Sequence, residues 1–285
     1  MSRPVMIFGA GQAGRMCRRL LNRQWTVTAF LDNDVSKKEV LGTPVLPPQA
    51  AADTRCDRVI IAVANPERGQ AMAHQLRQSG YSGEIIFFSD YQSLFDVRAA
   101  SMRLIAEQID RAGIPGDTAE LGVFQGAFAA LLNEALPGRS LHLFDTFEGF
   151  PAEHARQDHA AGYSAAEGGD FSETSPETVL AALPHPENVV LHQGIFPETF
   201  AGLEGCRFCL VSIDADLYQP TLDALERFWP RLSPGGALIL HDYNSAQYSG
   251  AGSAIRTFCA ARTLFPVPLG DLHGSAVLMK CGDAP

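Results

Sequence analysis

Two glycine-rich turns that follow strand-like runs constrain the fold of this chain more than any other feature. The first turn, Gly9–Gly14, comes directly after the apolar run Val5–Phe8, and the second, Glu120–Gly126, continues a short run that begins at Ala119. Around both turns, apolar runs alternate with helix-like stretches, which is typical of βαβ units with parallel strands. The sequence therefore predicts an α/β protein with two doubly wound domains, a small Rossmann-like domain at 1–92 and a larger one at 93–285.

The composition fits two such cores. Of the 285 residues, 46% are hydrophobic and 19% are charged, which excludes a disordered or fibrous chain. No apolar stretch approaches the ~20 residues of a membrane span, and the first residues run into a strand-like segment, unlike a signal peptide. We therefore expect a soluble, cytoplasmic protein with no membrane partner.

Charge is unevenly distributed along the chain. Residues 1–95 carry 11 Lys and Arg against 8 Asp and Glu, a net +3; residues 96–285 carry 11 against 24, a net −13, so the total is −10. Nucleic-acid binding needs a basic face, so it is not expected. The acidic part suits a cationic ligand such as a metal or a sulfonium, although solubility alone explains the imbalance as simply.

The first turn has the spacing of a dinucleotide-binding motif. Gly9, Gly11 and Gly14 form a GxGxxG between a strand and a helix, and Asp32 ends the next strand. Glycines at this spacing let backbone amides approach a pyrophosphate, and the carboxylate of Asp32 can accept hydrogen bonds from ribose hydroxyls. The motif predicts a nucleotide or nucleotide-sugar site, with a glycine turn kept only for packing as the alternative. No residues for hydride chemistry accompany it.

The second turn has a different spacing and a different charge. Glu120, Gly122 and Gly126 form an ExGxxxG with no Lys or Arg inside it, and Asp145 ends the following strand. The carboxylate of Glu120, at the first strand end, can bind an ammonium group, and that of Asp145, at the second, can accept hydrogen bonds from ribose hydroxyls. This pair fits S-adenosylmethionine better than a dinucleotide. A helix-start acid and a turn acid would explain each carboxylate alone, but not their joint placement.

A third set of polar residues follows two later strands. Asp214 and Asp216 come after one strand, and His241, Asp242 and Asn244 come after the next. Asp214, Asp242 and either His241 or Asn244 should converge at one sheet edge, where oxygen and nitrogen ligands suit Mg²⁺ or another divalent metal. Such a metal lowers the pKa of a bound hydroxyl. We assign Asp216 as the N-cap of the helix that follows it.

Residues 151–173 interrupt the alternation of strands and helices. The segment is poor in large apolar side chains and rich in Ala, Gly, Ser and acids. Loops of this length in compact domains are usually lids or disordered, and this one directly follows a strand end, where ligands bind in this fold class. We interpret it as a mobile cover over an active site, with a solvated insertion of no function as the alternative.

Five segments, in order and spacing, resemble the macrocin O-methyltransferase family. They are Glu120–Gly126, Asp145–Pro151 (DTFEGFP), Ile213–Thr221 (IDADLYQPT), Leu232–Gly236 (LSPGG) and His241-Asp242-Tyr243. The resemblance spans about residues 100–285 and implies a class I fold that binds S-adenosylmethionine and Mg²⁺ and methylates a hydroxyl of a sugar-like or natural-product substrate.

The resemblance also implies roles for individual residues. Asp214 would be catalytic and, with Asp242 and His241, would ligate the metal. The implied cofactor-binding residues are Glu120, Gly122, Phe124, Gly126, Asp145, Thr146 and Gly194. Many family members carry paired acids where this chain has His241-Asp242, and since histidine is a less natural ligand for Mg²⁺, the identity of the metal stays open.

The first 90 residues lie outside this resemblance. They are similar to the small nucleotide-sugar-binding domain that precedes some sugar acyltransferases. Two other hypotheses therefore stand beside the methyltransferase: an NAD-dependent oxidoreductase that uses the first turn, and a methyltransferase whose first domain is a silent sensor or assembly module. A homodimer is common among similar enzymes, but the apolar pattern does not demand one.

Overall fold

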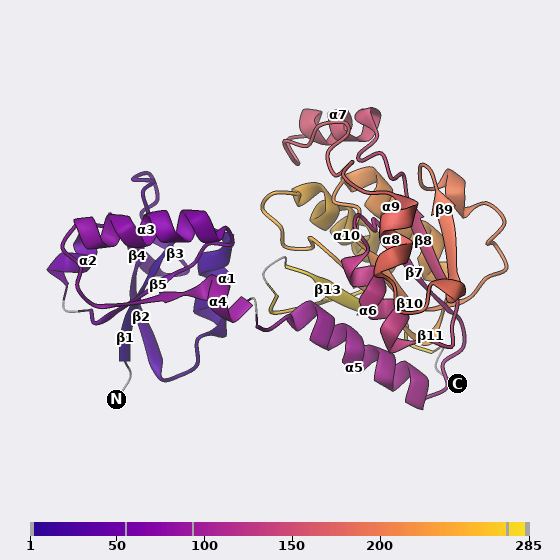
Figure 1. The fold of residues 1–285 in the computed structure, drawn as a ribbon, viewed down its shortest axis with the longest axis horizontal. Coiled ribbons are helices and arrows are strands. Elements are labelled where there is room, and N and C mark those ends of the chain that lie inside the picture. The colour runs from indigo at the N-terminus through magenta and orange to yellow at the C-terminus, as the bar shows by residue number, and fades with distance from the viewer. Residues whose placement is uncertain (1–2, 55, 93, 272–273, 283–285) are drawn as a thin grey trace. The chain divides into compact units, whose positions relative to one another are not determined.

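The computed structural model describes residues 3–282 apart from 55, 93, 272 and 273. The chain forms two compact units, one mainly of residues up to Asp96 and the other mainly of residues from Val97 onward (Figure 1). Each unit is a sheet covered by helices with cores of its own. The α/β class predicted from the sequence is confirmed.

The first unit is a six-stranded sheet in the order β3-β4-β2-β1-β5-β6. Alternate residues of β1 point to opposite faces: Val5 and Ile7 pack on the side of α1, and Met6 and Phe8 pack on the side of α3. The strands are β1 (Arg3–Phe8), β2 (Trp25–Leu31), β3 (Glu39–Val40), β4 (Thr43–Leu46), β5 (Arg58–Ile61) and β6 (Glu84–Phe87). The helices are α1 (Gln12–Leu20), α2 (Ala50–Asp53), α3 (Pro66–Gln78) and α4 (Phe88–Gln92).

The second unit contains a seven-stranded sheet in the order β12-β13-β11-β10-β7-β8-β9. Its strands are β7 (Asp117–Leu121), β8 (Leu141–Asp145), β9 (Val189–Gln193), β10 (Phe208–Ile213), β11 (Leu232–Leu240), β12 (Val267–Pro268) and β13 (Ala276–Met279). All neighbours from β9 to β11 are parallel, and β13 is antiparallel to both β11 and β12. The chain winds outward in both directions from β7, so β7 and β10 lie at the topological switch point where ligands bind in such sheets.

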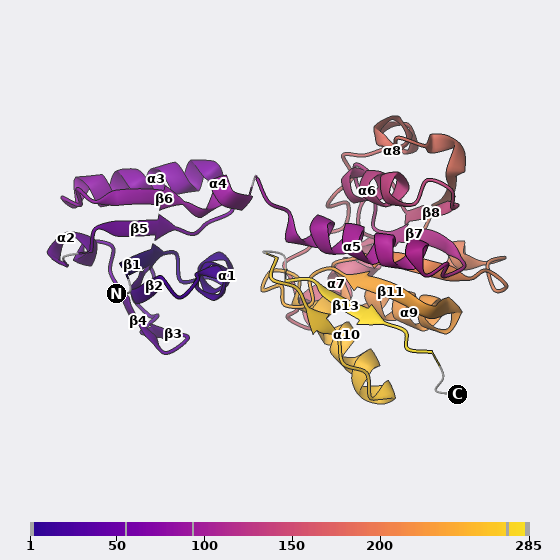
Figure 2. The same cartoon turned by 90° about the horizontal axis from the view of Figure 1, so that it is seen from below.

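Helices cover both faces of this larger sheet. Apolar residues of α5 (Val97–Arg111), α6 (Ala127–Ala135) and α8 (Pro176–Ala182) pack on one face, and those of α9 (Tyr218–Phe228) and α10 (Ser249–Arg262) pack on the other (Figure 2). Short 3₁₀ turns lie at Pro186–Asn188, Glu198–Phe200 and Trp229–Arg231. The fully buried rings of Phe144 on β8 and Phe208 on β10 both pack edge to face against Phe228, the last residue of α9. This packing fixes the strand ends that carry the polar residues.

The segment at 151–173 differs from the open loop that its composition predicts. It contains the helix α7 (Ala152–Ala160), which begins directly after Pro151, followed by a turn-rich return. Ala155 and Ala166 are buried against Leu217 at the start of α9. Small alanine side chains allow this close approach, whereas most of the other residues of the segment are exposed.

Candidate active site

The glycine loop, residues 120–126, is held against the neighbouring strand. Asp214 donates its backbone N–H to Leu121 at 2.9 Å, and Gly122 adopts φ +82°. A Cβ at Gly122 would overlap the carbonyl oxygen of Asp214. Gly122 is therefore required by the close approach of two strand ends, in addition to any ligand.

Asp145 organises this loop from the end of β8. Its Oδ2 accepts the backbone N–H groups of Val123 at 2.7 Å and Phe124 at 3.0 Å, and its Oδ1 accepts that of Phe147 at 2.8 Å. Oδ1 keeps a further lone pair, whereas both lone pairs of Oδ2 are used. Asp145 thus shapes the loop while staying partly exposed beside it.

Glu120 is the most unusual carboxylate of the loop. It is 1% exposed, its Oε2 has no hydrogen-bond partner among the described residues, and the Ser212 side chain bonds the carboxylate. Burial raises the pKa of Glu120 to about 8, against the opposing effect of the Arg98 charge. Buried oxygens without partners are rare in folded proteins, so this atom points to a missing donor.

Asp214, Asp216, His241 and Asp242 form an acid cluster at the ends of β10 and β11. One ligand atom from each lies within 4.8 Å of the others. His241 Nδ1 is 2.8 Å from Asp214 Oδ1 and 2.7 Å from Asp242 Oδ2. The convergence of Asp214 and Asp242 expected from strand order is present. Of the two alternatives beside them, His241 joins the cluster, and Asn244 donates its backbone N–H to Gly274.

The N-cap assignment of Asp216 is wrong. The helix α9 begins two residues later, and its N-cap position is Leu217. Asp216 has φ +56°, a left-handed conformation that turns its carboxylate back toward Asp242, with which it shares a hydrogen bond. The acceptor for the first N–H of α9 is Asp158, far away in sequence on α7.

Arg98 is a central residue that the sequence argument missed. It is 8% exposed on the first turn of α5, with Nη1 3.1 Å from Asp214 Oδ2, Nη2 3.1 Å from Ser212 Oγ and its guanidinium 3.9 Å from the Phe128 ring centre. It links Asp214 to the Ser212–Glu120 pair. Its only sequence signal is a charge beside the buried Ala99 and Met102 on a predicted helix.

The charges of the cluster depend on one another. Burial opposes ionisation of Asp214, but Arg98 and His241 outweigh it and lower the pKa of Asp214. Burial likewise opposes a charged His241, whereas Asp214 and Asp242 raise its pKa to about 10. Burial and then the two neighbouring carboxylates raise the pKa of Asp216. Asp214 and His241 therefore hold each other in their charged forms, beside an Asp216 that retains its proton more tightly than usual.

The lid segment, residues 151–173, is tied to the loop after β8. Phe150 donates its N–H to Asp170 and accepts that of Gly169, both at 3.0 Å. Gly149 has φ +78°, and a Cβ there would overlap the backbone of Gly169 and Asp170. Thr146, predicted to bind the cofactor, uses its hydroxyl to bond Gly149 O at 2.7 Å. The DTFEGFP segment therefore anchors the end of residues 151–173.

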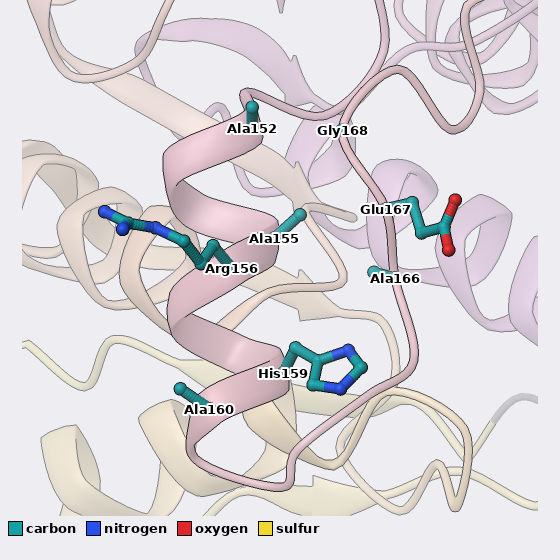
Figure 3. A pocket seen from close by; sticks show the side chains of 8 residues that line it. All are labelled: Ala152, Ala155, Arg156, His159, Ala160, Ala166, Glu167 and Gly168. Atoms are coloured by element: carbon teal, nitrogen blue, oxygen red, sulfur yellow. The ribbon is translucent and has the colours of Figure 1, made fainter.

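A pocket of about 350 Å³ lies between α7 and residues 166–168 of the lid segment. Figure 3 shows His159 turned into this gap, while Arg156 and Glu167 point away on opposite sides. Alanines and Gly168 form most of the remaining wall. The pocket is not lined by any residue of the acid cluster or the glycine loop.

Comparison with known proteins identifies the family. A model of the macrocin-O-methyltransferase (TylF) family matches residues 46–280. The chain belongs to the macrocin O-methyltransferase family.

Two curated relatives of this family member are natural-product enzymes. This chain is 31% identical over 157 residues to 8-demethyl-8-(2,3-dimethoxy-alpha-L-rhamnosyl)-tetracenomycin-C 4'-O-methyltransferase of Streptomyces olivaceus. The alignment covers 51% of this chain and 60% of that protein. This chain is 28% identical over 191 residues to mycinamicin III 3''-O-methyltransferase of Micromonospora griseorubida, covering 61% and 72%. The chain thus spans about 60% of the length of the first relative.

Solved structures agree with the fold of this macrocin O-methyltransferase family member. The O-methyltransferase NovP superposes with a TM-score of 0.54 at 21% identity and covers 65% of this chain and 80% of NovP. The calicheamicin methyltransferase CalS11 gives a TM-score of 0.53 at 21% identity and covers 77% and 88%. At this identity the likeness supports the class I fold alone.

The residues present fit both groups that the family implies. The partnerless Glu120 oxygen is a buried acceptor for an ammonium group of S-adenosylmethionine. The acid cluster offers three carboxylates and an imidazole to a divalent cation, and oxygen-rich sets suit Mg²⁺. Gly194, predicted on the cofactor side, donates its N–H to Asp145 O at 2.9 Å, and so lies beside the glycine loop's organising residue.

The residues of the first unit that were predicted to bind a nucleotide are explained in part by contacts within the fold. Asp32 Oδ2 accepts the N–H of Ala10 and lies 2.9 Å from Lys37 Nζ, and a Cβ at either Gly9 or Gly14 would overlap neighbouring backbone. A Cβ at Gly11 would meet nothing. Gly9 and Gly14 are thus explained by packing, which leaves Gly11 as the glycine that packing does not require.

Within the part of the chain that the structure describes, no helix has the length and apolar character needed to span a bilayer.

Proposed function

We propose that this protein is an S-adenosylmethionine-dependent O-methyltransferase that acts on a hydroxyl of a sugar-like or other natural-product substrate. The observation that carries the proposal is the juxtaposition of the acid cluster and the glycine loop at one sheet edge, where Asp214 bonds the backbone of Leu121. Family membership and the names of the relatives, both O-methyltransferases and one of a rhamnosyl group, support it.

In this proposal the glycine loop binds the cofactor. Glu120 accepts a hydrogen bond from the ammonium group, and Asp145 accepts one from a ribose hydroxyl with the remaining lone pair of Oδ1. The rest of the site is lined by Gly122, Phe124, Gly126, Thr146 and Gly194. The bound cofactor supplies a methyl group activated by its sulfonium. Holding that methyl beside the acceptor oxygen provides much of the rate enhancement, because orientation in the site replaces a bimolecular encounter.

Asp214 is the proposed catalytic residue. Arg98 and His241 keep it ionised, so it can accept a hydrogen bond from the substrate hydroxyl, orient it and take its proton. Asp214, His241 and Asp242 would hold a divalent metal, with Asp216 near enough to join them. Such a cation would supply positive charge that lowers the pKa of the acceptor hydroxyl.

Replacement of the catalytic carboxylate tests this proposal. We expect Asp214→Asn to lower methyl transfer to methyl α-L-rhamnopyranoside by about 10³-fold, measured with radiolabelled S-adenosylmethionine, while calorimetry still detects cofactor binding. The exposed Asp110→Asn on α5 is the matched control. Absence of cofactor binding to the unmodified protein refutes the proposed function, and full activity of Asp214→Asn refutes the assigned role.

The cofactor assignment has its own test. Glu120→Gln keeps the shape of the buried side chain but cannot ionise when an ammonium group binds, so we expect the dissociation constant of S-adenosylmethionine to rise about tenfold or more. Glu107→Gln, exposed on α5, should leave it unchanged. An unaltered constant in Glu120→Gln removes this residue from the cofactor site.

For the first unit we propose a nucleotide or nucleotide-sugar site at Gly9, Gly11, Gly14 and Asp32. The open space at Gly11 supports it, because a side chain there would block a ligand without disturbing the fold. Titration of the full chain with UDP-N-acetylglucosamine and with NAD separates the hypotheses. If the full chain binds one of these ligands and Gly11→Val does not, the site is supported. If the full chain binds neither ligand, the hypothesis of a silent module is favoured. The oxidoreductase hypothesis predicts NAD binding, and the methyltransferase family match gives it no support.

A further inference from the structure

The side chain of Arg98 bonds two side chains that project from one end of the same strand. Its Nη1 lies 3.1 Å from Asp214 Oδ2, and its Nη2 lies 3.1 Å from Ser212 Oγ. Ser212 is in β10, and Asp214 directly follows the last residue of that strand. Residues two apart along a strand point to the same face of the sheet, so one planar guanidinium can reach both. The guanidinium therefore fixes Ser212 and Asp214 relative to each other.

The arm that reaches Ser212 leads on to the glycine loop. Ser212 and Glu120 are register partners in β10 and β7, and the Ser212 side chain bonds the Glu120 carboxylate. A guanidinium can only donate, so Ser212 Oγ accepts from Arg98 and its own hydrogen is left for Glu120. The series of bonds therefore runs from Arg98 through Ser212 to Glu120, whose buried Oε2 is proposed to receive the ammonium group of the cofactor.

The other arm reaches the proposed catalytic carboxylate. Asp214 is bound on both oxygens, Oδ2 by Arg98 at 3.1 Å and Oδ1 by His241 Nδ1 at 2.8 Å. Bonds on both oxygens hold the plane of a carboxylate in one orientation. The orientation of the group proposed to take the acceptor proton thus depends on Arg98.

The fold gains little stability from a guanidinium at this position. Arg98 is 8% exposed, and its Nε has no hydrogen-bond partner among the described residues. A buried donor without a partner and a buried charge both oppose folding. A hydrophobic side chain could pack against the Phe128 ring, as the guanidinium does, without either penalty. These penalties indicate that Arg98 has a role in the site beyond filling the core.

We infer that Arg98 is a positioning residue for methyl transfer, an inference that rests on the proposed function. Its two arms keep Asp214, which receives the acceptor proton, at a fixed separation from Glu120, which holds the cofactor. Transfer requires the acceptor oxygen, the methyl carbon and the sulfonium sulfur to lie in line, and a displacement of ~1 Å can lower the rate about 100-fold. Arg98 thus acts through Asp214 and Glu120 and aligns the two reactants.

Replacement of Arg98 by lysine keeps the charge but removes the fork. One ammonium group on a flexible stem does not hold Asp214 and Ser212 in the same geometry. At saturating S-adenosylmethionine we expect Arg98→Lys to lower kcat for methyl α-L-rhamnopyranoside about 30-fold and to change its KM by less than about threefold, because misalignment affects the transition state more than binding. Arg103→Lys, exposed on the same helix, is the matched control and should change neither constant.

A second variant separates positioning from folding. Arg98→Ala leaves space for a free guanidinium ion, which should raise kcat of this variant about tenfold at concentrations that leave its melting temperature unchanged. Tetramethylammonium at the same concentration carries the charge without the donors and should not raise kcat. Unchanged kcat in Arg98→Lys, or equal recovery of Arg98→Ala with tetramethylammonium, overturns the inference.

Calorimetry of S-adenosylhomocysteine tests the arm toward the cofactor without turnover. We expect Ser212→Ala to raise the Kd of this product about threefold. Arg98→Lys added to Ser212→Ala should raise it no further, since both substitutions break the same series of bonds. Separate effects that multiply in the double variant overturn the link from Arg98 to Glu120.

The same measurements distinguish this inference from the proposed function. If the unmodified protein binds S-adenosylhomocysteine and methylates the pyranoside, and Arg98→Lys does so equally fast, the role of Arg98 is refuted while the methyltransferase proposal stands. If the unmodified protein does not bind the product, the proposed function fails and the inference about Arg98 fails with it.

Discussion

The carboxylate of Asp158 on α7 accepts the backbone N–H of Tyr218 at 3.0 Å and so caps α9 from 60 residues away. Asp158 is 3% exposed, and a Cβ at Gly250, near the start of α10, would overlap its Oδ2. The carboxylate therefore lies where two helices begin, and both N-termini carry partial positive charge. One side chain connects the lid segment to the helix that follows Asp214 and Asp216.

Substitution of Asp158 should distinguish its shape from its charge. Burial raises the pKa of Asp158, so the uncharged Asp158→Asn, which keeps an acceptor oxygen, should stay within about 0.5 kcal/mol of the original protein at pH 7. Asp158→Ala loses the cap and should cost about 1 kcal/mol or more. Urea denaturation measures both. Limited proteolysis between residues 160 and 170 should accelerate only in Asp158→Ala. Equal stability of Asn and Ala variants would contradict the cap.

Gly122→Ala should be one of the more damaging single substitutions in the second unit. A methyl group there would overlap Asp214 O, and the backbone has φ +82°, so we expect a loss of roughly 2 kcal/mol or more and a displaced Asp214. Thermal unfolding and methyl-transfer assays measure the two effects. Gly138→Ala, where a Cβ would meet nothing, is the control. Similar melting temperatures for both variants would argue against this close approach.

The pair formed by buried His142 and partly buried His192 should make the second unit sensitive to acid. His142 Nδ1 lies 2.9 Å from His192 Nε2, and the His192 ring stacks 4.3 Å from that of Phe144. Burial, and then the neighbouring His142, lowers the pKa of His192 to about 4. The unfolded chain binds this proton near pH 6.5, so stability is complete above pH 6.5 and falls as the pH drops toward 4.

His192→Gln tests this pH dependence. Acidification from pH 7 to pH 4.5 should lower the free energy of unfolding of the variant by about 1 kcal/mol less than it lowers that of the original protein. The difference is small because solvent screens the partly exposed ring. Urea midpoints at the two pH values measure it, and exposed His159→Gln is the control. An identical acid response in His192→Gln and the original protein would exclude His192 as its source.

The metal proposal predicts a response to chelation. Methyl transfer should fall after dialysis against a chelator and recover with Mg²⁺, and Asp242→Asn should weaken the Mg²⁺ response because it removes a charged ligand. His241→Asp replaces nitrogen by oxygen and should increase apparent Mg²⁺ affinity. Titration of activity with Mg²⁺ measures each variant. Full activity of the unmodified protein in the chelator would refute the metal.

Local patterns in the sequence predicted much of the fold and part of the site. The alternation of apolar runs and helix-like stretches indicated parallel sheets, and strand ends meet at one edge in such sheets. Strand order was sufficient to predict that Asp214 and Asp242, with His241 or Asn244, share one edge, and the fold brings Asp214, His241 and Asp242 together. The five family segments likewise lie within the matched residues 46–280.

Tertiary structure alone decided which side chains complete the site. Asp216 had a plausible local role as a helix cap, but it has a positive φ, and Asp158, 60 residues before Tyr218, caps α9 instead. Arg98 lies 116 residues from Asp214, and Phe171 joins rings from four segments. Periodicity reports the neighbours of a residue along its own strand or helix, whereas contacts between distant segments depend on how those elements pack. The sequence therefore determined the strand edge and its carboxylates, and only the packed fold determined their partners.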